Sequence, residues 1–72
     1  MEKLLNLKVS KEKMGEIFRL RRKERGLRQQ DVAEQAGVSI STVSNLELGN
    51  HIVKEESILA CAQVLEVADD IF

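Results

Sequence analysis

Four closely spaced residues combine three side chains that can hydrogen-bond with one that cannot: Ile40, Ser41, Ser44 and Asn45. The side-chain amide of Asn45 donates and accepts at once, so it can bond to N7 and N6 of adenine together. The hydroxyl groups of Ser41 and Ser44 can pair with several bases, whereas Ile40 can contact only the methyl group of thymine. These residues form a face that would point at solvent or at DNA.

Two short helices that cross tightly would position this face, and the surrounding residues have the types that such a crossing needs. Ala33 is small enough to let the helices approach, and Gly37 supplies the positive φ that turns the chain. Val43 and Leu46 lie on the other side of the second helix and would bury its inner surface. The pattern therefore predicts a pair of helices joined by a sharp turn.

Two further glycines mark helix ends on either side of this pair. Gly26 follows a helical pattern and precedes Leu27, and Gly49 follows the next pattern, both as left-handed caps. The runs 22–33, 36–39 and 43–49 together resemble the Xre/Cro family of helix-turn-helix DNA-binding domains, typified by phage repressors. The resemblance covers residues 14–72 and rests on the joint spacing of Gly26, Gln29, Ala33, Gly37, Val43, Leu46, Glu47 and Gly49.

The resemblance implies an all-α fold, a compact five-helix phage-repressor-like domain with the helix-turn-helix at its second and third helices. In that fold the third helix enters the major groove of double-stranded DNA, which makes the four residues above the base contacts. Phosphate contacts are expected from the start of the second helix, the start of the third and the loop after it: Arg28, Gln29, Ser39, Thr42, Asn50 and His51.

Three arginines relate to the family pattern in different ways. Arg22 and Glu47 match a pair that forms a salt bridge between the first and third helices of phage repressors, and its expected role is orientation. Arg28 stands where the family usually has threonine or serine as N-cap, which loses a bond worth about 1 kcal/mol but adds a cation beside a phosphate. Arg21 stands where many relatives carry leucine, which predicts a rotated helix end or a slightly different core.

Length and composition limit the kind of protein this can be. A chain of 72 residues holds one small domain, and the absence of proline with only 3% aromatic residues favours helices over a β-sandwich. No apolar run approaches the roughly 20 residues of a membrane helix, and no signal peptide is visible. We therefore expect a cytoplasmic protein without a membrane segment.

The sequence offers no support for catalysis. It contains no glycine-rich phosphate loop, no pair of carboxylates with a plausible cleft and no nucleophile with a nearby base. Cys61 is the single cysteine and falls on the apolar side of a predicted helix, which favours packing over a redox or metal role. We expect no enzyme activity, no cofactor and no metal.

The net charge of −1 argues against nucleic-acid binding if it is taken alone. The distribution of charge is uneven, however, because six basic residues crowd the stretch 19–28 and acidic residues concentrate near the C-terminal end. A molecule polarised in this way could still present a positive face to phosphates.

Helical spacing and caps predict five helices, over about residues 11–25, 29–36, 40–48, 55–65 and 69–72, with Ser10 and Ser39 as N-caps. The first would bury a stripe at Met14, Ile17 and Phe18. The fourth would bury Ile58, Leu59, Cys61, Ala62 and Leu65. Residues 1–10 form an N-terminal arm and residues 11–72 the helix-turn-helix DNA-binding domain.

The two ends of the chain each leave two possibilities. Leu5, Leu7 and Val9 alternate with polar residues, so the arm either frays or folds back onto the domain, or pairs as a strand across a dimer. The apolar pair Ile71 and Phe72 would either cover the core or meet a second subunit, and we assign it to a dimer contact.

These observations predict a sequence-specific DNA-binding transcriptional regulator, in the first place a repressor. It would bind a palindromic operator as a homodimer, with one third helix per subunit in the major groove. The competing interpretation is a protein-interaction module, antitoxin-like or anti-repressor-like, which uses the same scaffold to bind a protein partner. The apolar Ile40 and the acidic C-terminal end favour that alternative.

Overall fold

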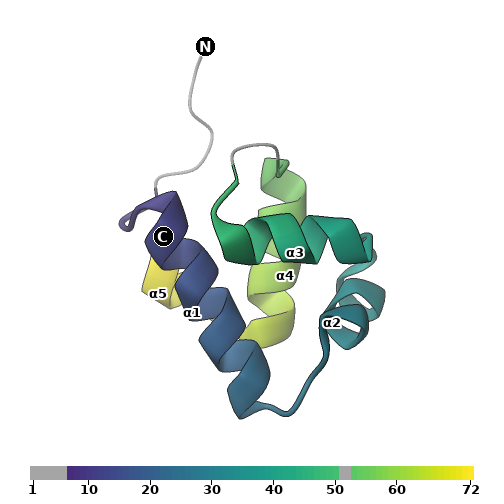
Figure 1. Ribbon diagram of the computed structural model, residues 1–72. Helices are drawn as coiled ribbons and strands as arrows, with labels where there is room; N and C mark the ends of the chain where they lie inside the picture. The colour runs from purple at the N-terminus through teal and green to yellow at the C-terminus, as the bar shows by residue number, and fades with distance from the viewer. Residues whose placement is uncertain (1–6, 51–52) are drawn as a thin grey trace.

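Five helices make up the computed structural model, which describes residues 7–50 and 53–72 (Figure 1). They are α1 (Lys11–Glu24), α2 (Gln29–Ala36), α3 (Ile40–Leu48), α4 (Glu55–Leu65) and α5 (Ala68–Ile71). The described residues contain no strand, so the predicted all-α, five-helix fold is confirmed. The bounds of α2, α3 and α4 agree with the expected ones, while α1 ends one residue early and α5 is displaced by one residue.

The bounds of the helices follow from the residues at their ends. Ser10 and Ser39 each accept a hydrogen bond from the N–H three residues later, at 3.0 and 3.1 Å, and so begin α1 and α3. After α1, Gly26 adopts a φ of 69°. The next N–H, that of Leu27, then donates to the carbonyl of Arg22 at 3.1 Å and closes the helix end.

The end of α4 is built differently, because Glu66 takes the left-handed conformation there with a φ of 57°. A residue with a side chain is disfavoured in this conformation by about 1–2 kcal/mol. Two contacts offset that cost. The N–H of Val67 donates to the carbonyl of Ala62 at 3.0 Å while its side chain is fully buried, and the Glu66 carboxylate pairs with Arg25 Nη2 at 2.9 Å.

The core is formed by apolar side chains from every helix and from Val67, which precedes α5: Met14, Phe18, Val32, Ala33, Val43, Leu46, Ile58, Cys61, Ala62, Leu65, Val67 and Ile71. The expected burial of Leu59 is wrong, because this side chain is exposed. The buried positions of α4 follow the spacing i, i+3, i+4, i+7 from Ile58, and Leu59 falls outside that stripe. Ile17 is only partly buried against the core.

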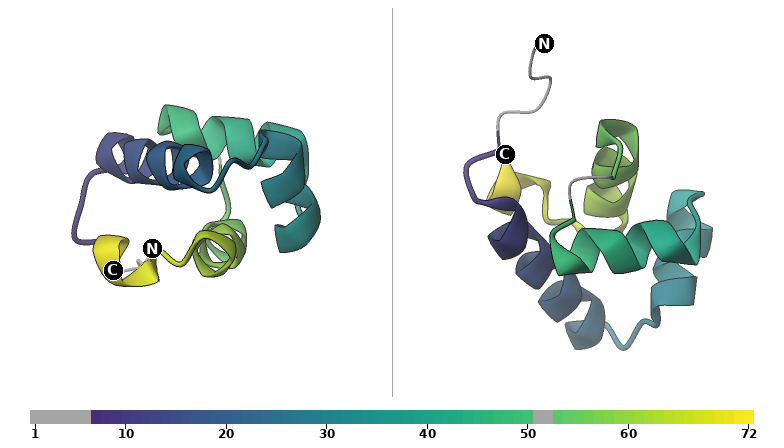
Figure 2. Two further views of the ribbon diagram at one scale, coloured as in Figure 1. Left: turned by 90° about the horizontal axis from the view of Figure 1, so that it is seen from below. Right: turned by 45° about the horizontal axis from the view of Figure 1, so that its top comes forward.

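The helices lie in two layers. Figure 2 (left) shows α1 and α3 together above α4 and α5, with α2 at one side. In Figure 1, α3 crosses in front of α4 and α1 runs beside both. The core lies between the layers, so one long side of α3 is left facing away from the domain.

The described part of the N-terminal arm, residues 7–10, folds back onto the domain. The N–H of Lys8 donates to the carbonyl of Ile71 at 2.9 Å, and Leu7 and Val9 pack partly buried against the core. The remaining arm residues, Leu5 among them, lie outside the described residues. Ile71 is completely buried within its own chain, so it covers the core and has no surface for the expected dimer contact, whereas Phe72 is partly buried.

Candidate nucleic-acid interface

The outward face of α3 carries the residues expected to contact bases. All four lie on its solvent-facing side, as exposed Ile40 and Ser41 and half-buried Ser44 and Asn45. Leu48, for which no role was expected, lies on the same face and is 69% exposed. It follows Ser44 by four residues, about one helical turn, and this spacing could have identified it.

The position of α3 depends on a close approach to α1 at Gly15. A Cβ atom at Gly15 would lie 2.5 Å from the carbonyl oxygen of Glu47 and 2.6 Å from that of Leu46. The backbone of α3 therefore packs directly on the backbone of α1 at this residue, which only glycine permits. Nothing in the residues around Gly15 marks this requirement, because it comes from a helix distant in the sequence.

The ion pair expected between Arg22 and Glu47 lies beneath the interface and joins α1 to α3. Arg22 Nε donates to Glu47 Oε2 at 2.6 Å and Nη2 donates to Oε1 at 3.1 Å. Arg22 Nη1 also donates to the carbonyl of Leu27 at 3.0 Å. The hydrogen bonds that Arg22 donates to Glu47 raise the pKa of Arg22 above its ordinary value, so the guanidinium stays charged.

Gln29, the first residue of α2, extends this network. Its Nε2 donates to Glu47 Oε1 at 3.0 Å, so the side-chain amide is directed at the end of α3. The network therefore ties together the end of α1, the start of α2 and the end of α3. The amide of Gln29 is thus already used within the domain. A phosphate at the start of α2 would be bound by the backbone N–H groups of the first turn of α2.

Arg28 is the N-cap residue of α2, and its guanidinium gives no capping bond because it has no acceptor. Asp31 accepts a hydrogen bond from the backbone N–H of Arg28 at 2.8 Å, which forms half of a capping box. The two side chains also pair at 2.9 Å, and these bonds from Arg28 lower the pKa of Asp31 to about 2. The cation expected beside a phosphate is thus already paired within its own helix.

A groove of about 350 Å³ runs between the turn before α3, α3 itself and the start of α4. It is lined by Gly37, Val38, Ser39, Ser41, Thr42, Asn45, Val53, Lys54 and Ser57. Ser39 Oγ and Thr42 Oγ1 lie 2.9 Å apart, and Asn45 Oδ1 accepts a hydrogen bond from Asn50 Nδ2 at 2.7 Å. Three predicted contact residues of α3, Ser41, Thr42 and Asn45, therefore share this groove with Ser39, whereas Ile40 and Ser44 do not line it. His51 lies outside the described residues.

Two arginines near the end of α1 are used inside the domain, where they cap α4. Arg21 Nη1 donates to the carbonyl of Glu66 at 3.1 Å, and Arg25 Nη1 donates to that of Val64 at 3.0 Å. Cations are favoured at this end of a helix because its last carbonyls are unpaired. Arg21 thus replaces the leucine of the family pattern by capping a neighbouring helix instead of filling the core.

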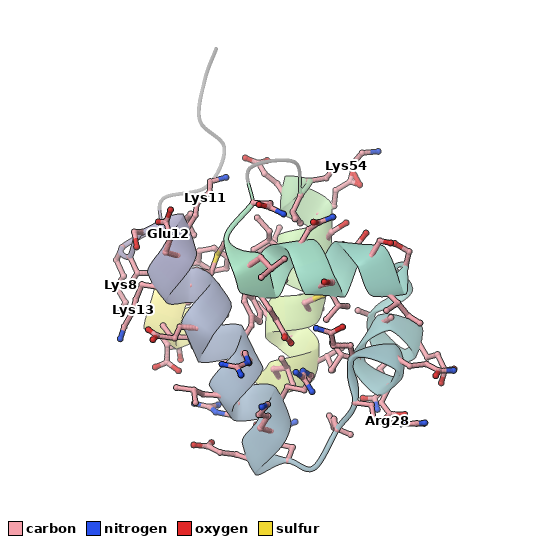
Figure 3. The ribbon with its side chains drawn as sticks, in the orientation of Figure 1. Lys8, Lys11, Glu12, Lys13, Arg28 and Lys54 are labelled. Carbon is pink, nitrogen blue, oxygen red and sulfur yellow. The ribbon has the colours of Figure 1, made fainter. Side chains whose placement is uncertain are left out.

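The expected positive face made by the stretch 19–28 is largely neutralised. Four of its six basic side chains pair with carboxylates: Arg21, Arg22, Arg25 and Arg28. In Figure 3, Lys11 lies at the start of α1, Lys54 at the start of α4 and Arg28 before α2, whereas Lys8 and Lys13 lie on the side of α1 that faces away from α3. Positive charge near α3 therefore comes from several separate helix starts.

Other chemistry finds little support in the described residues. Burial raises the pKa of the Cys61 thiol to about 11, which favours a packing role. Within residues 7–50 and 53–72, no group of three or more His, Cys, Asp or Glu side chains is arranged to hold a metal ion. No helix in this part of the chain is long and apolar enough to cross a membrane.

The model of a family described as a helix-turn-helix domain matches residues 13–71. No curated protein matches the chain. The matched segment contains α2, the turn and α3 together with the helices that pack against them. The chain therefore belongs to this helix-turn-helix family, a type of domain that binds DNA.

Proposed function

We propose that this protein is a sequence-specific transcriptional regulator that binds a palindromic operator as a homodimer and represses by occupying it. Each subunit places α3 in the major groove, with base contacts from Ile40, Ser41, Ser44 and Asn45. The observation that carries the proposal is the outward face of α3 in a domain of the helix-turn-helix family.

The way in which α3 is held supports a recognition role. Base readout requires side chains that are positioned before binding, because every side chain ordered on binding costs about 0.5–1.5 kcal/mol. The close crossing at Gly15 and the Arg22–Glu47 pair fix α3 from its buried side without using its outward face.

Phosphate contacts would come from the helix starts that surround α3. Lys11 and Lys54 are added to the residues proposed from the sequence, which are Arg28, Gln29, Ser39, Thr42, Asn50 and His51. Lys54 is exposed, is the N-cap residue of α4 and lines the same groove as Asn45. A lysine and the backbone N–H groups of a helix start together favour an anion.

The dimer contact is proposed on the side of α1 next to the C-terminal end. A groove of about 420 Å³ lies there, lined by Val9, Lys13, Ile17, Leu20, Arg21, Glu24 and Asp70. Leu20 is an exposed leucine in this groove, and Phe72 follows close behind Asp70. A second copy would cover Leu20 while charges of both signs on the rim face their opposites.

Leu20→Lys tests the dimer, because an exposed position tolerates the change without loss of the core. Sedimentation should shift toward monomer, and affinity for a full palindrome should fall much more than affinity for a half-site. If the variant dimerises over the same concentration range as the wild type, this surface is not the dimer contact.

The function as a whole is tested by selecting bound fragments from random double-stranded DNA. We expect a palindromic consensus with half-sites about one helical turn apart. Binding to it should weaken steeply between about 50 and 200 mM salt, because several phosphates release counterions. Recovery of no enriched sequence by the intact, folded protein would overturn the proposal.

A second candidate is the protein-interaction module. Ile40 and Leu48 are both exposed large apolar residues on α3, and neither can hydrogen-bond to a base. A protein partner bound through them would show little salt dependence over the same range and would lose affinity in Leu48→Ala. The same variant should retain DNA binding if Leu48 lies outside the base contacts.

A further inference from the structure

The end of α3 brings Asn50 back against Asn45. Gly49 turns the chain with a φ of 79°, and the N–H of Asn50 then donates to the carbonyl of Asn45 at 3.0 Å. Gly49 is also buried against α1, where a Cβ atom would lie 3.1 Å from Cα of Glu12. Both the conformation of the turn and its packing therefore fix the position of Asn50.

The side chains of these two residues are bonded as well, with Asn50 Nδ2 donating to Asn45 Oδ1 at 2.7 Å. A lone asparagine can turn its amide by half a rotation and present either its oxygen or its NH₂ group. Here the oxygen of Asn45 faces Asn50. The NH₂ group is therefore the end of the amide that is left for another partner.

We propose that Asn50 is a positioning residue that sets the base preference of Asn45, an inference that rests on the proposed function. Because Asn50 holds Oδ1, Asn45 meets the base with a donor. The N7 atom of a purine or the O4 atom of thymine can accept a hydrogen bond from this donor, but cytosine presents only its N4 donor in the major groove. The second lone pair of Oδ1 remains for a donor, so adenine, with N7 and N6 side by side, fits best.

The test reverses the polarity of the pair. In Asn50→Asp the carboxylate can only accept, so it binds the NH₂ group of Asn45 and turns the oxygen toward the base. The selected site is made with each of the four bases at every position of a half-site. Asn45→Ala identifies the contacted position as the one where discrimination is lost.

At that position the wild type should bind cytosine about tenfold or more weakly than adenine. Asn50→Asp should abolish or reverse this ratio, and Asn50→Ala should bring the four bases closer together. Thermal unfolding of each variant is recorded alongside, and Asn50→Ala carries the test if the aspartate variant does not fold.

Ser39→Asp is the matched control for charge. It adds the same negative charge near the groove, keeps a carboxylate that can cap α3 and does not touch Asn45 in the present hydrogen-bond pattern. It should lower affinity for all sequences without changing the base ratio. If Asn50→Asp and Asn50→Ala both bind with the wild-type ratio, the positioning role is wrong while DNA binding stands. A wild type that selects no sequence would overturn both proposals.

Discussion

Two arginine–carboxylate pairs stand on either side of the turn into α2, with similar nitrogen–oxygen distances of 2.6 and 2.9 Å. The side chains of Arg22 and Glu47 are 12% and 5% exposed, whereas those of Arg28 and Asp31 are 73% and 24% exposed. The first pair connects two helices far apart in sequence, and the second lies within one helical turn. Because they differ in burial, the two arginine–carboxylate pairs have different roles in the molecule.

Removal of one member of this largely buried pair is destabilising, because the other would stay mostly desolvated without its ionic partner. Its two charges therefore fix how α1 and α3 are oriented. The exposed pair is screened by water and salt, so it adds little to the fold beyond the cap at α2. It can exchange its partner when a phosphate approaches.

The largest effect is expected for Glu47→Ala, which breaks the buried pair from one side. Gln29 loses its acceptor and Arg22 keeps only its bond to the carbonyl of Leu27, so we expect the free energy of unfolding to fall by about 3 kcal/mol, measured by urea denaturation. The double variant Arg22→Met, Glu47→Leu removes both charges and should be more stable than Glu47→Ala. A loss in Glu47→Ala no larger than that in Asp31→Ala would contradict the distinction between the pairs.

The next effect is expected for Gly15→Ala, which separates the helices that the buried pair joins. Alanine normally stabilises a helix relative to glycine by roughly 1 kcal/mol. Here the new Cβ would meet the backbone of Glu47, and we expect a net loss of about 1–3 kcal/mol in urea denaturation. Glu16→Ala, at the exposed neighbouring position, is the control and should change stability little. If Gly15→Ala is more stable than the wild type, α3 can move away from α1 without loss of stability.

The sequence predicted the parts of the fold that depend on local signals. The end of α2 and both ends of α3 were correct because Gly37, Ser39 and Gly49 determine them locally. The end of α4 at Leu65 was also predicted, but not the left-handed conformation of Glu66 that closes it, because the ion pair of Glu66 is with Arg25 at the end of another helix. Gly15 was missed for the same reason, because only the approach of α3 gives it a role.

Side-chain roles were harder to predict where a charged group had several possible partners. The crowded arginines suggested a positive surface, but Arg21 and Arg25 cap α4 and pair with acids from the C-terminal end. That pairing depends on the tertiary fold, so the stretch alone does not reveal it. The Arg22–Glu47 pair was predictable only through the family resemblance, which already contains the tertiary arrangement.

A smaller effect on stability is expected at the exposed pair, and it should depend on pH. The pKa of Asp31 is lowered to about 2 in the folded protein, against about 3.9 for an unperturbed aspartate. The contribution of its charge is therefore fully present above about pH 4 and is lost as the pH falls toward 2. Urea denaturation of the wild type and Asp31→Asn should differ at neutral pH and converge in acid.

Asp31→Ala separates the cap from the charge. Asparagine keeps an oxygen for the N–H of Arg28, whereas alanine removes it, so Asp31→Ala should be the less stable of the two at every pH. Equal stability of the two variants would mean that the half capping box contributes nothing.

The smallest effect concerns how the exposed pair responds to DNA. If Arg28 leaves Asp31 for a phosphate, Arg28→Ala should weaken binding to all sequences alike and reduce the salt slope by about one unit. Asp31→Asn should act in the opposite direction, because it removes a competing carboxylate without removing the cation. Binding of both variants to the selected site and to an unrelated duplex, at matched salt, measures the two effects. A change in preferred sequence with an unchanged slope would assign Arg28 to base readout. If neither the salt slope nor the preferred sequence changes, Arg28 stays paired with Asp31 in the complex. The backbone N–H groups of α2 would then bind the phosphate without Arg28.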